Sequence, residues 1–425
     1  MASDPAFLTT QEGGVLISLC RESVLMMRLL RRFARLDAAA GMTLIAATLL
    51  ALLMANIPLT ASGYDKVLTT PFHVAWGEIR IHASLLHVIN DGLMTLFFLM
   101  VGLEVKRELM VGALASRRQA LLPVAAALGG MVVPALIYLA INAADAHTRV
   151  GWAIPTATDI AFAVGILVLL GKRVPLGLKV FLLALAIIDD LGAILVIALF
   201  YTQQLHGWAL LGAALSALIL AYLNWRQVMN TPAYLLVGVV VWFCVLLSGV
   251  HATLAGVVVG FLIPLRAPAG QPSPAKALEH RLSGWVAFLI IPLFAFANAG
   301  IALQGVDATQ MLSPLTVGIA AGLLIGKPLG IMLFSGGVIA LRLATLPAGV
   351  NFRQLSAVSV LCGIGFTMSI FITLLSFGSD ADAATVLYAK LAILLSSLAA
   401  GVFGFIALRI ALPAVPAYTP VPRDE

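Results

Sequence analysis

The sequence predicts an all-α polytopic membrane protein with about twelve transmembrane helices. Of its 425 residues, 61% are hydrophobic and only 10% are charged, whereas a soluble domain carries about 25% charged residues. Apolar runs long enough to cross a bilayer follow one another along almost the whole chain. The basic residues alternate between the predicted loops as such crossings require. This composition excludes a soluble enzyme, a nucleic-acid-binding protein and a disordered chain.

The spans are read from the apolar runs, because a helix needs about 20 apolar residues to cross a hydrocarbon core of about 30 Å. The run at 250–265 is the shortest, and the alternative is that it forms a single span together with a neighbouring run. Candidate runs lie near residues 38–57, 85–105, 121–143, 152–170, 176–202, 207–225, 232–248, 250–265, 284–302, 314–341, 354–377 and 384–411.

The Lys and Arg residues test this count, because cytoplasmic loops of membrane proteins are enriched in them. With the N-terminus inside, the predicted cytoplasmic segments hold 19 of the 25 basic residues and the opposite segments hold 3. One missed span would invert every later loop and destroy this asymmetry. The count therefore predicts that both termini are cytoplasmic, and the net charge of +6 follows largely from topology.

Three segments outside the spans carry predictions of their own. Residues 1–26 are weakly patterned, and we expect a disordered cytoplasmic extension before a transporter domain at 27–411 and a cytoplasmic tail at 412–425. A cleaved signal peptide is the alternative for the N-terminus, although its apolar region is usually about 7–15 residues long. The outer loop 58–84 contains alternating residues at 74–81, which favour either a short periplasmic β-hairpin or an extended loop.

Four charged residues fall near the middle of predicted spans, where a charge costs at least about 2.5–3.5 kcal/mol. Asp189 and Asp190 are adjacent in one span, Asp159 lies in the span before it, and Lys327 lies in the tenth. A single buried Asp is often only a structural hydrogen-bond acceptor, but two in succession double the insertion cost. Lys327 is too far from either interface to reach water, so it needs a carboxylate partner or a polar cavity.

Two of the spans carry helix interrupters beside polar residues. Pro155 removes a backbone donor, and Thr156 and Thr158 can bond the backbone groups that are freed. The fourth span is therefore predicted to be a broken helix, with a simple proline kink as the alternative. Gly363 and Gly365 weaken the eleventh span in the same way, although close helix packing also explains them.

An odd number of crossings separates the two interruptions, so their helices run in opposite directions. Spans three to five and ten to twelve then form inverted repeats, which are typical of secondary transporters. Where the broken helices cross at mid-membrane, two N-termini concentrate positive charge and two C-termini concentrate negative charge. Asp159 is expected to offset the first and Lys327 the second.

Carboxylates, hydroxyls and backbone carbonyls at mid-membrane form a hard-oxygen site suited to Na⁺, Li⁺ or H⁺. The three cysteines, which are far apart, give no transition-metal pattern, and we expect no cofactor. A carboxylate that binds either a cation or a proton produces exchange by competition. Asp189 and Asp190 can together release two protons for one monovalent cation, which would move net charge.

The chain resembles the NhaA family of sodium/proton antiporters over about residues 27–410, with the matching stretches in family order. These stretches are NDGLMTLFFLMVGLEVKREL (90–109), GWAIPTATDIAFAVG (151–165), LALAIIDDLGAI (183–194), SGVHATLAGVVVGFLIPL (248–265), SPAKALEH (273–280), IIPLFAFANAG (290–300), GLLIGKPLGI (322–331) and LCGIGFTMSIFI (361–372). The resemblance implies a twelve-helix transporter of the bacterial cell inner membrane. It would export Na⁺ or Li⁺ and import protons for sodium and pH homeostasis.

The resemblance also implies roles for individual residues. Asp189 and Asp190 match the paired aspartates that bind the cation and protons, supported by Asp159 and Thr158, and Lys327 matches a lysine paired with Asp189. It further implies a homodimer held through the 58–84 hairpin, although this loop matches less closely. The positions associated with pH response are Glu104, Arg107, Glu108, His251, Lys276 and Glu279.

Three other functions fit parts of the pattern. An intramembrane aspartyl protease needs two facing carboxylates, but the Gly-x-Gly-Asp signature of such enzymes is missing at Asp159 and Asp190 and Lys327 would have no role. A sodium-coupled symporter of an organic anion should have a basic substrate pocket near the crossing. A channel is the third alternative, although a paired aspartate site that binds tightly suits exchange better than conduction. The sequence therefore favours a transporter rather than an enzyme.

Overall fold

The structure, a computed structural model, describes residues 39–413 except 77–78, 203–204, 269–271 and 379–381. The predicted extension 1–26 and all but the first two residues of the predicted tail 412–425 lie outside the described residues.

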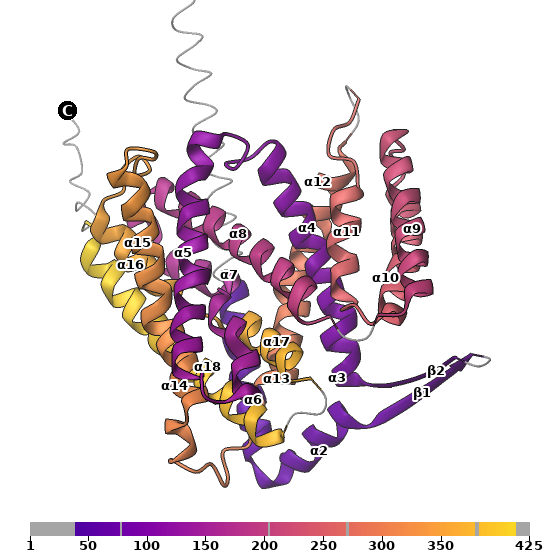
Figure 1. Ribbon diagram of the computed structural model, residues 1–425, viewed down its shortest axis with the longest axis horizontal. Helices are drawn as coiled ribbons and strands as arrows, with labels where there is room; N and C mark the ends of the chain where they lie inside the picture. Colours follow the sequence, from indigo (N-terminus) through magenta and orange to yellow (C-terminus); the bar gives the residue numbers. More distant parts are fainter. Residues whose placement is uncertain (1–38, 77–78, 203–204, 269–271, 379–381, 414–425) are drawn as a thin grey trace, which may run out of the picture.

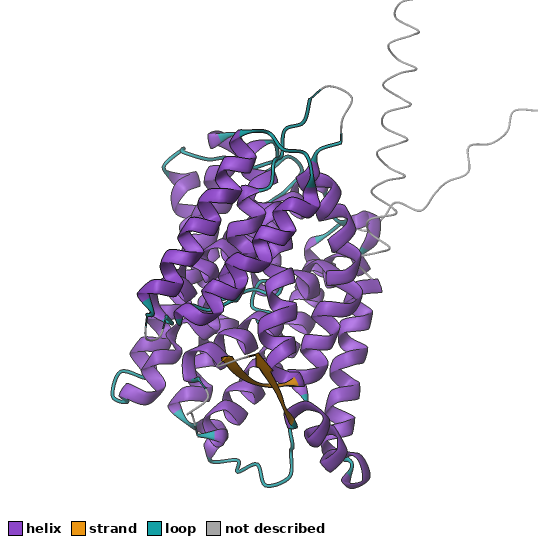
Figure 2. Ribbon diagram, turned by 90° about the vertical axis from the view of Figure 1, so that its right-hand side faces the viewer, coloured by secondary structure: helices purple, strands orange, loops and turns teal. Residues whose placement is uncertain are grey.

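Helices that run roughly side by side make up nearly all of the described chain (Figures 1 and 2). Within it, nine helices are long and apolar enough to cross a membrane. They are Ala39–Asn56, Leu85–Met110 (α3 Leu85–His87, η2 Val88–Leu93 and α4 Met94–Met110), α5 (Arg117–Ile141), α8 (Leu176–Phe200), α9 (Gly207–Trp225), α10 (Thr231–Ser248), Pro274–Ala299 (α12 Pro274–Trp285, η5 Val286–Ile290 and α13 Ile291–Ala299), Pro314–Ala340 (α14 Pro314–Ala321, η7 Gly322–Gly326 and α15 Lys327–Ala340) and α18 (Ala383–Ala411).

Two further pairs of helices are bent at a short break, at the two places where the sequence predicts an interruption. The first pair is Ala146–Thr156 (α6 Ala146–Arg149 and η3 Val150–Thr156) with α7 (Ile160–Leu169), bent by 41°. The second is α16 (Phe352–Leu361) with α17 (Phe366–Phe377), bent by 49°. Counting each pair as one span gives up to 11 spans in the described chain, besides a shorter apolar helix, α11 (Thr253–Leu262).

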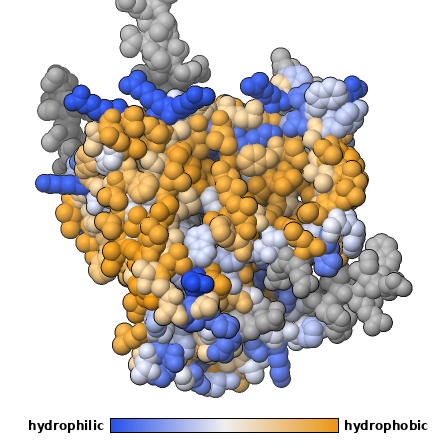
Figure 3. All heavy atoms as spheres, viewed as in Figure 1, coloured by the Kyte–Doolittle hydropathy of each residue, from blue (hydrophilic) through white to orange (hydrophobic). Residues whose placement is uncertain are grey.

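The outer surface fits a bilayer. Large apolar side chains such as Leu199, Leu236 and Ile410 are about three-quarters exposed. On the face that it draws, Figure 3 shows a broad apolar band with hydrophilic residues gathered at its upper and lower edges. A surface of this kind is unstable in water but matches lipid. The protein is therefore a multi-pass membrane protein.

Glycines set the closest helix contact beside the broken helices. The backbones of α5 and α15 touch at Gly129 and Gly330, where a Cβ on either residue would run into the carbonyl group of the other. Gly326 likewise lies against Pro134. Small residues allow such close approach in membranes, where van der Waals packing drives helix association. This contact fixes the position of Lys327, which begins α15 one residue after Gly326.

The two breaks lie against each other in the middle of the bundle. The backbone N–H of Asp159 donates to the carbonyl of Ile364 at 2.7 Å. The hydroxyl of Ser369 donates to the carbonyl of Ile154, also at 2.7 Å. These bonds satisfy backbone groups that the interrupted helices leave free, which buried polar groups require.

Three segments add detail to the predicted boundaries. The segment 58–84 contains a helix, α2 (Pro58–Thr69), which begins with a proline and buries Tyr64 against Phe296. It continues into two antiparallel strands, β1 (Pro71–Trp76) and β2 (Ile79–Ser84). The span predicted from residue 284 begins ten residues earlier, because Ser273 caps the helix and Pro274 occupies its first position.

Candidate ion-binding site

The centre of the bundle contains a buried ion pair between Lys327 and Asp189. Both side chains are 0% exposed. The ammonium group of Lys327 also donates to the carbonyl of Thr156, at the end of η3. Thr158 donates its hydroxyl to the same oxygen of Asp189 at 2.6 Å, and contacts the carbonyl of Cys362 at 3.0 Å. Lys327 therefore lies where η3 and α16 end, and its positive charge complements the negative ends of these helices.

Asp159 lies at the opposite helix ends of the crossing. Its carboxylate accepts from the backbone N–H of Phe162 at 3.0 Å and so caps the start of α7. The other oxygen accepts from both the backbone N–H and the hydroxyl of Thr367, at 3.1 and 2.5 Å, at the start of α17. Two helix N-termini therefore share one carboxylate, whose negative charge complements their positive ends.

Asp190 differs from both of these aspartates. It is 3% exposed, and its side chain has no hydrogen bond to another described residue. The charges that act on it most strongly include the carboxylates of Asp189, Glu104 and Asp159. In the described chain, Oδ1 of Asp189 also lacks a hydrogen-bond partner. A buried carboxylate oxygen in this state is costly unless a cation or a proton satisfies it.

The structure thus brings together all five residues that the sequence places at the centre: Asp159, Asp189, Asp190, Lys327 and Thr158. Two other groups lie there to which the sequence alone assigns no role. One is Thr367, a hydroxyl that the sequence places just after the Gly-x-Gly interruption but does not link to Asp159. The other is the carbonyl of Cys362, which no property of the side chain could have indicated.

The six residues for which the resemblance implies a role in pH response lie in two separate places. Arg107, near the end of α4, pairs with Glu108, with Glu279 at 2.9 Å and with Glu104 at 3.9 Å. Lys276 is on the same helix as Glu279, and its backbone N–H donates to Ser273 at 3.4 Å. Because Glu104 also acts electrostatically on Asp190, this cluster extends from the helix ends toward the central site.

His251 lies at the other end of the bundle, between α10 and α11. Its Nε2 is 2.8 Å from the carbonyl oxygen of Tyr201, which directly follows α8. Burial lowers the pKa of His251, while the bond to Tyr201 and the negative charge of Asp91 act against this shift. His251 therefore does not contact the Arg107 cluster.

The donor set of the central site is made of oxygens. Two carboxylates, one hydroxyl and backbone carbonyls suit a hard monovalent cation. Within the described residues, no group of three or more His, Cys, Asp or Glu is placed to hold a metal ion.

The family model described as Na⁺/H⁺ antiporter 1 matches residues 31–408. A protein of Pectobacterium carotovorum named Na⁺/H⁺ antiporter NhaA is 65% identical over 388 residues, 91% of this chain and 97% of that protein. Proteins of the same name are 64% identical over 390 residues in Pectobacterium atrosepticum and 59% identical over 389 residues in Yersinia pseudotuberculosis, covering 92% of this chain and 99% and 98% of those proteins.

Proposed function

The chain belongs to the Na⁺/H⁺ antiporter 1 family and is a sodium/proton exchanger, and we propose that Asp189 and Asp190 are the carboxylates at which Na⁺ and protons compete. The observation that carries this proposal is the state of Asp190. It is buried among other carboxylates and has no hydrogen bond within the described chain. A cation or a proton would remove the cost of that charge, and either one excludes the other.

Asp189 supplies the second ligand. One of its oxygens is held by Lys327 and Thr158, and the other lacks a hydrogen-bond partner in the described chain. A Na⁺ ion that binds both carboxylates competes with Lys327 for the charge of Asp189. The hydroxyl of Thr158 lies within 2.6 Å of Asp189 and can orient the carboxylate. Li⁺ has the same hard-oxygen preference, so we propose that it is also a substrate.

A charge count at the crossing favours electrogenic exchange. The two helix N-termini at Asp159 and the two C-terminal ends near Lys327 have opposite partial charges of similar size. The three aspartates and Lys327 then leave two uncompensated negative charges when all are ionised. Two protons neutralise them fully, whereas one Na⁺ neutralises half. Exchange of two protons for one Na⁺ would move one net charge and respond to the membrane potential.

Regulation and arrangement in the membrane complete the proposal. We propose that the cluster around Arg107 responds to cytoplasmic pH and that His251 responds at the opposite face. The cluster consists of Glu104, Arg107, Glu108 and Glu279, with Lys276 beside it.

If α11 is counted as a crossing, the chain has twelve spans. We propose that these spans include inverted repeats, that both termini face the cytoplasm, and that the protein is located in the inner membrane. We also propose a homodimer through the 58–84 segment and no cofactor.

The test is transport by purified protein in sealed vesicles that contain a pH-sensitive dye. After a proton gradient is imposed, NaCl, LiCl or KCl is added outside, from about pH 6.5 to about pH 9. We expect Na⁺ and Li⁺, but not K⁺, to dissipate the gradient. Asp190→Asn should abolish this response while the protein stays folded, and Asp65→Asn, which changes an exposed aspartate of α2, should not.

Two outcomes would contradict the proposal. Full activity of Asp190→Asn would remove this residue from the site. Equal rates with and without an ionophore that clamps the membrane potential at zero would contradict electrogenic exchange, because charge-moving transport opposes itself when the potential is free to rise.

A further inference from the structure

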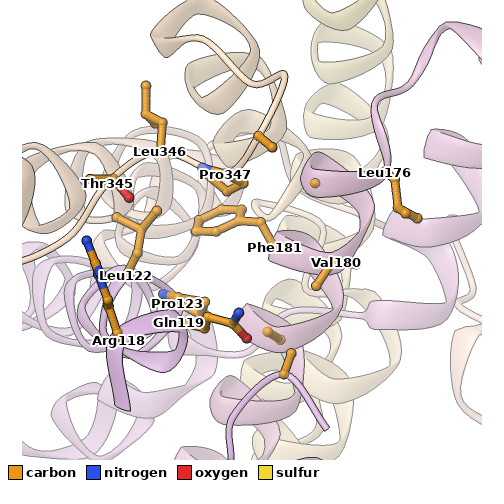
Figure 4. Close-up of a pocket in the computed structure, with 14 residues that line it drawn as sticks. Arg118, Gln119, Leu122, Pro123, Leu176, Val180, Phe181, Thr345, Leu346 and Pro347 are labelled. Atoms are coloured by element: carbon orange, nitrogen blue, oxygen red, sulfur yellow. The ribbon is translucent and has the colours of Figure 1, made fainter. Parts of the chain in front are cut away.

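A cavity of about 700 Å³ opens at the end of the bundle where α5 and α8 begin (Figure 4). The first turns of both helices line it, together with residues 345–348, which follow α15. In the close-up, Arg118, Leu122 and Thr345 lie on one side of the cavity and the ring of Phe181 points into it from the other. None of the central carboxylates lines this cavity.

One end of the cavity is suited to an anion. Arg118 supplies a guanidinium group that matches phosphate geometry, and Gln119 and Thr345 add polar groups. Neither Ser116 nor Pro175, which precede α5 and α8, caps its helix through a side chain. The amides of Gln119 and Leu178 already bond to the carbonyls of Ser116 and Pro175, so only the first two backbone N–H groups of each helix remain available for an anion.

Acidic side chains near the cavity do not cancel the positive charge of Arg118. None of the described residues that line the cavity is Asp or Glu. Glu108 lies behind the wall, where it accepts from the backbone N–H of Ala113 at 2.8 Å and pairs with Arg107. Its carboxylate is thus bonded to Arg107 and to the backbone of Ala113, and Glu108 does not line the cavity.

The remainder of the wall is apolar and continues onto the surface that faces lipid. Leu122 and Phe181 are buried, while Leu176 and Val180 are 54% and 42% exposed along the outside of α8. A soluble anion such as inorganic phosphate would leave this surface without a partner. An amphiphile would use both parts, because its headgroup and its chain occupy the two kinds of wall.

We propose that this cavity binds an anionic phospholipid, with the phosphate at Arg118 and the two helix starts and the acyl chain along α8. The proposal does not depend on which residues exchange ions. It does connect lipid to the central site, since α8 carries Asp189 and Asp190 and residues 345–348 follow the helix that begins with Lys327. A lipid here would hold these elements together.

Thermal stability of the full-length purified protein tests the proposal. The protein is delipidated in a neutral detergent and titrated with phosphatidylglycerol at constant total lipid, with phosphatidylcholine as the remainder. We expect a saturable rise in Tm with phosphatidylglycerol. Arg118→Gln should raise the half-saturating phosphatidylglycerol fraction about tenfold, because it removes a charge-assisted bond to phosphate. Arg117→Gln, next to it but outside the cavity lining, should change it less than about twofold.

A second variant separates the cavity from surface charge. Ala348→Trp places a large side chain at an exposed position of the lining and should abolish the saturable response without changing any charge. Equal losses in Arg118→Gln and Arg117→Gln would overturn the proposal in favour of general surface attraction. An equal Tm rise with soluble glycerol phosphate would also overturn it, because the acyl chain would then contribute nothing.

Discussion

Replacing Lys327 by alanine should destabilise the protein by leaving Asp189 buried without its cation. Both side chains are 0% exposed, so solvent screens neither charge. Removing one partner of a buried pair costs about 3–5 kcal/mol, mostly because the remaining charge is uncompensated. The change also frees the carbonyl of Thr156, which accepts a bond from Lys327. The loss should therefore lie at the upper end of this range.

The assay is thermal unfolding of purified protein in detergent at neutral and alkaline pH, because a higher pH favours the ionised form of the uncompensated Asp189. A loss of this size corresponds to a fall in Tm of about 3–6 °C for a chain of this length. Lys179→Ala is the matched control, because Lys179 is half-buried near the start of α8 and forms no ion pair with a described residue. Its Tm should change by less than about 1 °C.

The double variant Lys327→Ala/Asp189→Asn distinguishes charge from packing. If the unpaired carboxylate causes the loss, neutralising it should recover more than half of the lost Tm. A Lys327→Ala protein as stable as the parent at both pH values would refute the pairing argument. A double variant less stable than Lys327→Ala would show that side-chain packing, rather than charge, causes the loss.

Three further predictions concern helix contacts and pH. Thr367→Val removes a hydroxyl that bonds Asp159, the buried carboxylate that caps α7, and should lower the free energy of unfolding by about 1.5–3 kcal/mol. Thr373→Val is the control, because the hydroxyl of Thr373 bonds only its own helix; this change should lower the free energy of unfolding by about 1 kcal/mol. Gly129→Ala should force α5 and α15 apart and lower Tm. Gly336→Ala, on the open side of α15, should instead raise the free energy of unfolding by about 0.5–1 kcal/mol. The reverse order of the two Tm values would contradict the packing argument. Because burial lowers the pKa of His251, the unfolded chain binds this proton more readily than the folded protein, and stability should fall as the pH falls below about 6.5. His251→Gln should flatten this part of the curve of Tm against pH. An unchanged curve would show that His251 is not the cause of the fall.

Much of the fold follows from the sequence because the bilayer imposes simple rules. Run length and the distribution of basic residues predict a polytopic helical protein, and Pro155 and the pair Gly363 and Gly365 predict both breaks. The boundaries are less predictable. The polar first turns of α12 hide its start, since a helix that extends beyond the hydrocarbon no longer needs apolar side chains. The helix α2 lies outside the spans, and tertiary contacts such as that of Tyr64 with Phe296 help to explain why it forms.

The site is predictable in its residue types but less so in its contacts. The cost of a charge at mid-membrane identifies Asp159, Asp189, Asp190 and Lys327 without a structure. The bonds that Thr367 makes to Asp159 join residues 208 apart in the chain, and no local pattern indicates such a pairing. Backbone groups such as the carbonyl of Cys362 cannot be inferred from residue type at all, because every residue has one.

The three aspartates of the site have the same side chain but differ in their hydrogen bonds, because their neighbours differ. Asp159 is fully hydrogen-bonded between two helix N-termini, so a proton or a cation there would displace bonds that the fold already makes. Asp189 has one oxygen bonded to Lys327 and Thr158, so a cation can bind it only in competition with an ammonium group. Asp190 has no such bond in the described chain and lies next to Asp189. A cation that binds Asp190 consequently disturbs the fewest existing interactions, which is why substitution of Asp190 should remove transport while substitution of Lys327 should first remove stability.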